Sequence, residues 1–120
     1  MERFKIKKRF ARKDRIRKKV KGDSDRPRLT IYKSLRHIYA QIIDDNGGKT
    51  LAFTSTLGRE FKDRMKPSKN LEAAKLIGEL IADKALQKGI KRLVFDRNGY
   101  IYHGKIAAIV TKVREKGIII

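Results

Sequence analysis

The stretch RLTIYKSLRHIYAQIIDDNGGKTLAFTST, residues 28–56, determines the fold of this chain. Apolar and polar residues alternate at its start and again from Ile38, a pattern typical of half-buried strands. Residues 34–37 suit a turn, and residues 44–48, DDNGG, form a stronger one because Asn and Gly adopt positive φ at low cost. A third β-forming run covers residues 51–56. The stretch therefore predicts a three-stranded antiparallel meander with one apolar face that needs a cover.

The next part of the chain predicts that cover. Residues 57–67 are polar, and we expect them to be irregular. Ser68 or Asn70 can cap a helix that ends at Gly89. The apolar stripe of this helix has helical spacing and consists of Ala74, Ile77, Ile81 and Ala85.

A crossover completes the sheet. Residues 93–95, LVF, are wholly apolar and suit a short strand buried on both faces. A second helix is expected between Gly104 and Gly117. The predicted fold class is α/β, in which the meander and a βαβ crossover strand form a mixed sheet packed by two helices.

The charge is very unevenly distributed along the 120 residues, which suffice for one domain. Thirty-two Lys and Arg against thirteen Asp and Glu give a net charge of +19, and residues 1–28 hold fourteen of the bases with only four acids. We therefore divide the chain into a basic N-terminal arm, residues 1–27, and a globular domain, residues 28–120. Charge of this density indicates a polyanionic partner.

The composition argues against several classes of protein. Cysteine is absent and only two His are present, so a metal site is not expected, and neither is thiol chemistry. No phosphate-binding loop, nucleophile elbow or dinucleotide fingerprint occurs, so we expect no enzyme activity, cofactor or small-molecule substrate. The first residues lack the apolar segment of a secretory signal, and no apolar run could span a membrane. A cytoplasmic protein is expected.

The arm is the strongest candidate for nucleic-acid contact. It carries twelve bases in its first twenty-one residues, and its few apolar residues form no broad stripe, which argues against a membrane-surface helix. Alone, such a segment should repel itself and stay open. Laid along phosphates it could become helical, because Lys, Arg and Ala propagate helices well.

Residues 96–104, DRNGYIYHG, form a loop that core packing does not explain. Its aromatic rings could stack on bases, and Arg97 could bond a phosphate in a fork. Alternatively, Asp96 pairs with Arg97 while the tyrosines fill gaps between helix and sheet. Asp96 and His103 could also be drawn as the acid–base pair of a small hydrolase. Residue types alone leave the first two readings open, whereas the hydrolase fits poorly because the chain has no catalytic motif.

Three blocks of the sequence resemble the bacterial large-subunit ribosomal protein L-eighteen family. They are residues 26–29, RPRL, residues 36–41, RHIYAQ, and residues 95–105, FDRNGYIYHGK, and the helix from Asn70 to Lys88 also fits. The resemblance implies an α/β body that binds 5S rRNA and helps attach it to the 23S rRNA in the central protuberance of the large subunit. It also implies ribosomal protein L-five as a neighbour. A general basic nucleic-acid-binding protein is the alternative function.

The resemblance and the charge pattern together predict RNA contacts in three regions. These are the arm, the segment around residues 28–39 and the loop after residue 96. The predicted RNA-binding residues are Arg3, Lys7, Lys8, Arg9, Arg12, Lys13, Arg15, Arg17, Lys18, Arg28, Lys33, Ser34, Arg36, His37, Tyr39, Arg97, Tyr100, Tyr102, His103 and Lys105.

Two positions depart from the family pattern. The family often has Gly where this chain has Asn98, but Asn also tolerates a left-handed turn. The family commonly ends in an aromatic residue, whereas this chain ends in three isoleucines. The loop is therefore expected to keep its shape, and a contact by a terminal ring is not expected.

Overall fold

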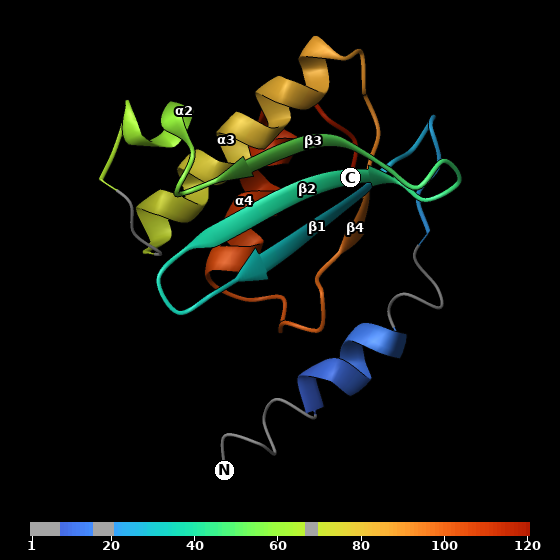
Figure 1. Ribbon diagram of the computed structural model, residues 1–120, viewed down its shortest axis with the longest axis horizontal. Helices are drawn as coiled ribbons and strands as arrows, with labels where there is room; N and C mark the ends of the chain where they lie inside the picture. The colour runs from blue at the N-terminus through green and yellow to red at the C-terminus, as the bar shows by residue number, and fades with distance from the viewer. Residues whose placement is uncertain (1–7, 16–20, 67–69) are drawn as a thin grey trace.

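The computed structural model describes residues 8–15, 21–66 and 70–120. Its sheet has the strand order β3-β2-β1-β4, with two helices on one face (Figure 1). The strands are β1 (Arg28–Lys33), β2 (Ile38–Asp44), β3 (Lys49–Ser55) and β4 (Val94–Asp96). The helices are α2 (Arg59–Lys62), α3 (Leu71–Gln87) and α4 (Lys105–Glu115), and residues 8–15 are also helical.

The meander and the crossover are confirmed. Strands β1, β2 and β3 pair antiparallel in sequence, and β4 pairs parallel with β1 after the chain has passed through α3. The period of two places Leu29 and Ile31 of β1 on the helix-covered face, where both are fully buried. Tyr32 points to the opposite face and is half exposed. The face of the sheet that the helices do not cover therefore carries partly exposed aromatic side chains.

Helix α3 covers the sheet with the predicted stripe. Ala74, Ile77, Ile81 and Ala85 are all fully buried. Asn70 is the N-cap, since its side chain accepts a 2.8 Å hydrogen bond from the Ala73 amide; the alternative cap, Ser68, lies outside the described residues. Gly89 follows the helix with a φ of +75°, as a C′ glycine does.

Helix α4 packs against α3, and its apolar side chains enter the same core. The two helices approach closely at Gly78, where an added Cβ would lie 2.8 Å from the Ile109 carbonyl oxygen. This contact explains a glycine in a helix interior. After α4, Ile118 is buried, and Ile119 exchanges backbone hydrogen bonds with Lys91 and Leu93. The terminal isoleucines thus tie the end of the chain back to the domain.

Two local expectations were wrong or incomplete. Within residues 57–67, Phe61 is fully buried and anchors the short helix α2 where an irregular segment was expected. Strand β4 was expected to be buried on both faces, but it is an edge strand, and Val94 and Phe95 are only partly buried. Leu93, which precedes it, carries most of the burial of this run.

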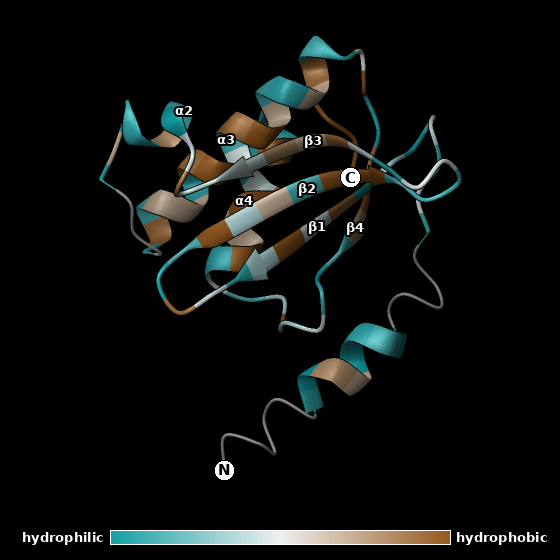
Figure 2. Ribbon diagram, viewed as in Figure 1, coloured by the Kyte–Doolittle hydropathy of each residue, from teal (hydrophilic) through white to brown (hydrophobic). Residues whose placement is uncertain are grey.

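Hydropathy separates the domain from the arm (Figure 2). Brown, apolar positions line the strands and α3, whereas the helix over residues 8–15 is mostly teal. Residues 22–27 are bonded to the domain, because the Asp45 amide donates to the Gly22 carbonyl and the Val94 amide donates to the Pro27 carbonyl. The division between residues 27 and 28 stays a prediction.

Candidate nucleic-acid interface

The helical segment of the arm lies against the loop that follows β4. Arg9 Nε donates a 3.2 Å hydrogen bond to the Asn98 carbonyl, and Arg12 Nε donates a 2.7 Å bond to the Gly99 carbonyl. The Arg9 guanidinium also lies 4.3 Å from the centre of the Tyr100 ring, within cation–π range. An open arm was expected for the chain alone; residues 8–15 are instead helical and rest on the domain.

Two left-handed residues shape the loop where the arm rests on it. Asn98 has a φ of +55° and Gly99 a φ of +79°. The Asn98 amide donates to Asp96 Oδ1 at 2.8 Å, which holds this turn. An added Cβ on Gly99 would lie 2.2 Å from the Arg9 carbonyl oxygen. The loop therefore keeps its left-handed turn with Asn at position 98, and it needs Gly at position 99 for the arm to approach.

The loop also joins the turn between β1 and β2, 67 residues away in the sequence. The Tyr100 hydroxyl accepts a 2.9 Å bond from the Lys33 amide and donates a 3.1 Å bond to the Lys33 carbonyl. Lys33 Nζ lies 4.9 Å from the centre of the same ring. The structure thus brings together two of the regions predicted to bind RNA.

The remaining predicted residues of the turn have distinct roles. Ser34 Oγ accepts from the His37 amide at 3.2 Å and so closes the turn. His37 Nδ1 lies 2.8 Å from Thr56 Oγ1, which ties the ring to the end of β3. Arg36 is exposed beside them. The turn therefore presents a cation on a backbone that its own polar side chains hold in place.

The open face of the sheet next to the arm is aromatic. Tyr32 and Tyr39 have ring centroids 5.7 Å apart, and Tyr39 and Phe53 have centroids 6.4 Å apart. These rings line a shallow hollow of about 290 Å³ together with Thr30, Gln41 and Asn98. Arg9 reaches toward this face, since its guanidinium lies 5.9 Å from the Tyr32 ring centre. A row of partly exposed rings beside an arginine suits base stacking.

Sequence reasoning found only Tyr39 on this face. The period of two was a signal for the other rings, since it puts Tyr32 and Phe53 on the polar side of their strands. In the structure Tyr32 lies directly opposite Tyr39 in the register, and Phe53 lies on the next strand. Aromatic residues on the polar side of an alternating strand are not covered by the helices. Such positions could have been added to the candidate site from the sequence.

Arg28 occupies a different environment from the other predicted RNA ligands. Only 8% of the residue is exposed, and its guanidinium bonds Asp45 and Asp96. Burial alone lowers the pKa of Arg28, but the hydrogen bonds and charges of these two carboxylates outweigh it, so the pKa is raised above its ordinary value. Of the readings left open for this loop, the pairing of Asp96 with Arg97 is wrong, because Asp96 is paired with Arg28.

The rest of the loop faces outward. Tyr102 is 44% exposed and packs edge-on against Phe95, with centroids 6.1 Å apart. His103 is exposed and Lys105 begins α4. Tyr100, whose ring contacts Arg9, and Tyr102 thus each combine a packed ring with partial exposure. The hydrolase pairing is not formed, because Asp96 is fully buried on Arg28 and Asn98 while His103 faces solvent.

The arm residues fall into two groups. Arg9, Arg12 and Lys13 are partly buried, whereas Lys8 and Arg15 are exposed. Arg3, Lys7, Arg17 and Lys18 lie outside the described residues. Over the ranges that the structure describes, no three His, Cys, Asp or Glu side chains gather as metal ligands, and no helix has the length and apolarity to cross a membrane.

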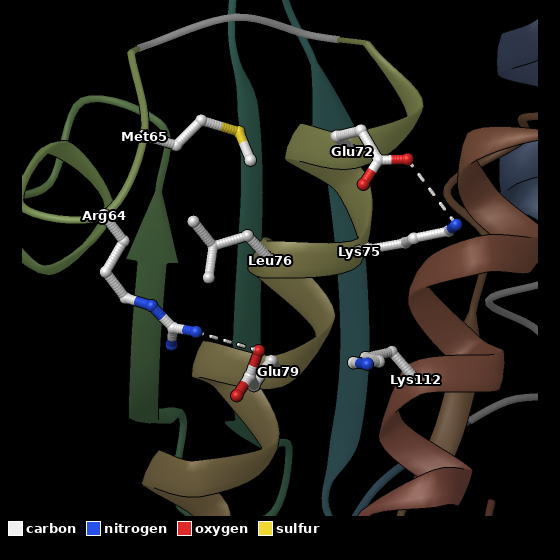
Figure 3. Close-up of a pocket in the computed structure, with 7 residues that line it drawn as sticks. All are labelled: Arg64, Met65, Glu72, Lys75, Leu76, Glu79 and Lys112. Carbon is white, nitrogen blue, oxygen red and sulfur yellow. Dashed lines mark hydrogen bonds and ion pairs between the residues drawn. The ribbon is translucent and has the colours of Figure 1, made fainter.

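The helix layer on the opposite side has a different electrostatic character. Between the segment that follows α2 and the helices α3 and α4, a groove of about 230 Å³ is lined by side chains of both signs (Figure 3). Glu79 lies 3.3 Å from Arg64 and 3.5 Å from Lys116, which also lies 3.1 Å from Asp83. Here the cations are largely neutralised by neighbouring carboxylates, so this layer is a weaker candidate for phosphate contact than the arm side.

An α/β domain with a cationic arm beside an aromatic sheet face is typical of small ribonucleoprotein components. The sequence profile of the family described as ribosomal L18 of archaea, bacteria, mitochondria and chloroplast matches residues 3–120. The chain therefore belongs to the ribosomal L18 family. It is a structural protein of the large ribosomal subunit, not an enzyme, and its cellular location is that of the ribosome in the cytoplasm.

Three similar proteins align with this chain over most of their own length. The chain is 58% identical to the large ribosomal subunit protein uL18 of Dictyoglomus thermophilum over 104 residues, which are 87% of this chain and 85% of that protein. It is 52% identical to the uL18 protein of Myxococcus xanthus over 114 residues, 95% of this chain and 96% of that protein. The corresponding protein of Heliobacterium modesticaldum is 56% identical over 104 residues, 87% of this chain and 85% of that protein.

Proposed function

We propose that this protein binds 5S rRNA and helps attach it to the 23S rRNA in the central protuberance, with ribosomal protein L-five as a neighbour. The choice of RNA comes from the family resemblance. The observation that carries the proposal is the placement of the arm helix by Arg9 and Arg12 on the loop beside the open aromatic face.

The arm and the domain have different roles in this proposal. Exposed arm cations neutralise phosphates, which supplies affinity without sequence preference. The aromatic face and the segment around Lys33, Tyr100 and Arg36 form one continuous, rigid surface that meets an irregular RNA fold. Such a surface recognises RNA by shape and by stacking on unpaired bases.

The test is a filter-binding titration on 5S rRNA at physiological salt, with tRNA and duplex DNA as competitors. A preference for 5S rRNA of about a hundredfold or more is expected if the domain recognises an RNA shape. Equal binding to all three nucleic acids would support the general basic binder instead.

The salt dependence tests the arm separately. If about six to eight phosphates are neutralised, the slope of log affinity against log salt should be about −5 to −7. Deletion of residues 1–21 should weaken binding and flatten this slope. An unchanged slope in the shortened chain would exclude the arm from the interface.

A further inference from the structure

Arg28 lies between two neighbouring strands of the sheet. As the first residue of β1 it pairs with Ile43 of β2 on one side and with Val94 of β4 on the other. The turn after β2 and the end of β4 are therefore both within reach of its side chain.

The guanidinium uses both of these neighbours. Its Nε and Nη2 donate 3.0 Å bonds to the two carboxylate oxygens of Asp45, and Nη1 donates a 2.6 Å bond to Asp96 Oδ2. The fork on Asp45 is bidentate, a geometry that a lysine ammonium cannot reproduce. Asp96 is fully buried, and the Arg28 side chain is only 10% exposed. The positive charge of the Arg28 guanidinium is thus bonded to carboxylates of the domain and is largely shielded from solvent.

Each carboxylate also holds a backbone amide. Asp45 Oδ2 accepts a 2.7 Å bond from the Gly22 amide, and Asp96 Oδ1 accepts a 2.8 Å bond from the Asn98 amide. Gly22 is packed so closely that an added Cβ would lie 2.2 Å from the backbone nitrogen of Arg28. Arg28 therefore fixes two backbone points through its two partners.

These two points are where the arm meets the domain. Gly22 lies at the domain end of the arm, and the Asn98–Gly99 carbonyls receive Arg9 and Arg12. We propose that Arg28 is a positioning residue of the RNA interface, which aligns the arm at both of its attachments through Asp45 and Asp96 without touching RNA itself. This inference rests on the proposed function.

The substitution Asp45→Asn separates positioning from direct contact by the sign of its effect. It raises the net charge of the protein by one and releases part of the Arg28 guanidinium. If Arg28 were an RNA ligand, the change would leave binding unchanged or strengthen it. If Arg28 positions the arm, the affinity for 5S rRNA should fall about three- to tenfold despite the added charge.

Asp44→Asn is the matched control. It makes the same charge change in the neighbouring residue of the same turn. Asp44 Oδ1 accepts from the Asn46 and Gly47 amides, a role that the Asn carbonyl oxygen also fills, and no described bond joins Asp44 to Arg28. The Asp44→Asn protein should bind 5S rRNA at least as tightly as the wild type.

A second measurement on the full chain needs no RNA. Hydrogen exchange of the Gly22 amide should be faster in Asp45→Asn than in Asp44→Asn, because its acceptor has lost its charge. Equal exchange in the two variants, or equal affinity for 5S rRNA, would overturn the positioning role. A third outcome would also overturn it. If the affinity of Asp45→Asn returns to that of Asp44→Asn at a lower temperature, where circular dichroism shows both variants fully folded, the loss would reflect stability alone.

Failure of the proposed function has a different signature. A wild-type protein without preference for 5S rRNA would remove that function, and the competitors in the titration show this directly. The amide exchange comparison would still decide whether the Asp45 carboxylate holds the domain end of the arm at Gly22.

Discussion

Arg12 and Gly99, which lie 87 residues apart in the sequence, are joined by a 2.7 Å hydrogen bond from Nε to the carbonyl oxygen. The acceptor is a neutral backbone group, so this contact holds Arg12 without placing a carboxylate on its guanidinium that would compete with phosphates. The arm can be aligned by the domain while its outer cations keep a positive field. Alignment of this kind lowers the ordering cost of binding RNA.

Gly99→Ala should detach the arm helix. The residue has a φ of +79°, and the new Cβ would meet the Arg9 carbonyl. We expect a backbone strain of about 1–2 kcal/mol together with loss of the contact. The Arg12 Nε–H should then exchange faster with solvent, as measured by NMR, and the affinity for 5S rRNA should fall.

Gly89→Ala controls for the strain alone. Its φ of +75° is nearly the same, and nothing lies within 4 Å of the added Cβ. It should lower Tm by a similar amount while the Arg12 Nε–H stays protected. Faster exchange in both variants would show that the arm responds to general destabilisation.

Phe53→Ala tests the aromatic face. Phe53 is 44% exposed, so its removal costs little core packing. If a base stacks on it, the loss should be about 1–3 kcal/mol of binding free energy, which is about fivefold to 150-fold in Kd. Filter binding to 5S rRNA measures this loss.

Leu86→Ala is the control for that experiment. Leu86 is 41% exposed and lies on α3, in the helix layer. Its replacement removes a comparable exposed apolar side chain from the other side of the molecule and should leave Kd unchanged. A similar loss in both variants would contradict stacking on Phe53.

The sequence predicted most of the sheet and both long helices, because these depend on local periodicity. The wrong or missing details depend on contacts between distant residues. Phe61 gave no periodic signal, being an isolated apolar anchor in a polar segment. A pair between Asp96 and its neighbour Arg97 was one of the readings that the sequence left open, yet the partner of Asp96 is Arg28, 68 residues away. The pairing follows from the register of β1 with β4, which the sequence does not specify.

Gly78→Ala should destabilise the domain although alanine is the better helix former. Propensity alone favours Ala by about 1 kcal/mol. The added Cβ, however, would lie 2.8 Å from the Ile109 carbonyl oxygen, a backbone atom that cannot move aside without shifting α4. Overpacking of this kind costs about 1–3 kcal/mol, so a lower Tm is expected. Gly47→Ala, with its nearest neighbour at 3.6 Å, is the control and should change Tm little.

The stability contributed by Glu79 should depend on pH in a defined direction. Burial alone raises the pKa of Glu79, but the charges of Arg64 and Lys116 outweigh it and hold the pKa below its ordinary value of 4.5. A carboxyl with a lowered pKa in the folded state stabilises the protein above the unfolded pKa. The contribution is lost as the pH falls through the folded pKa.

Glu79→Gln should therefore lower Tm near pH 7, and the difference from the wild type should shrink as the pH falls below 4.5 and through the folded pKa. An exposed ion pair typically contributes about 0.2–1 kcal/mol, and Glu79 has two cationic partners with its side chain 24% exposed. Glu115→Gln is the control, because Glu115 is 59% exposed and lies 3.5 Å from Lys112 alone among the described cations. Its effect on Tm should be smaller throughout this pH range. A Glu79→Gln difference that stays constant with pH would show that the side chain stabilises the groove by packing, since packing does not depend on its charge.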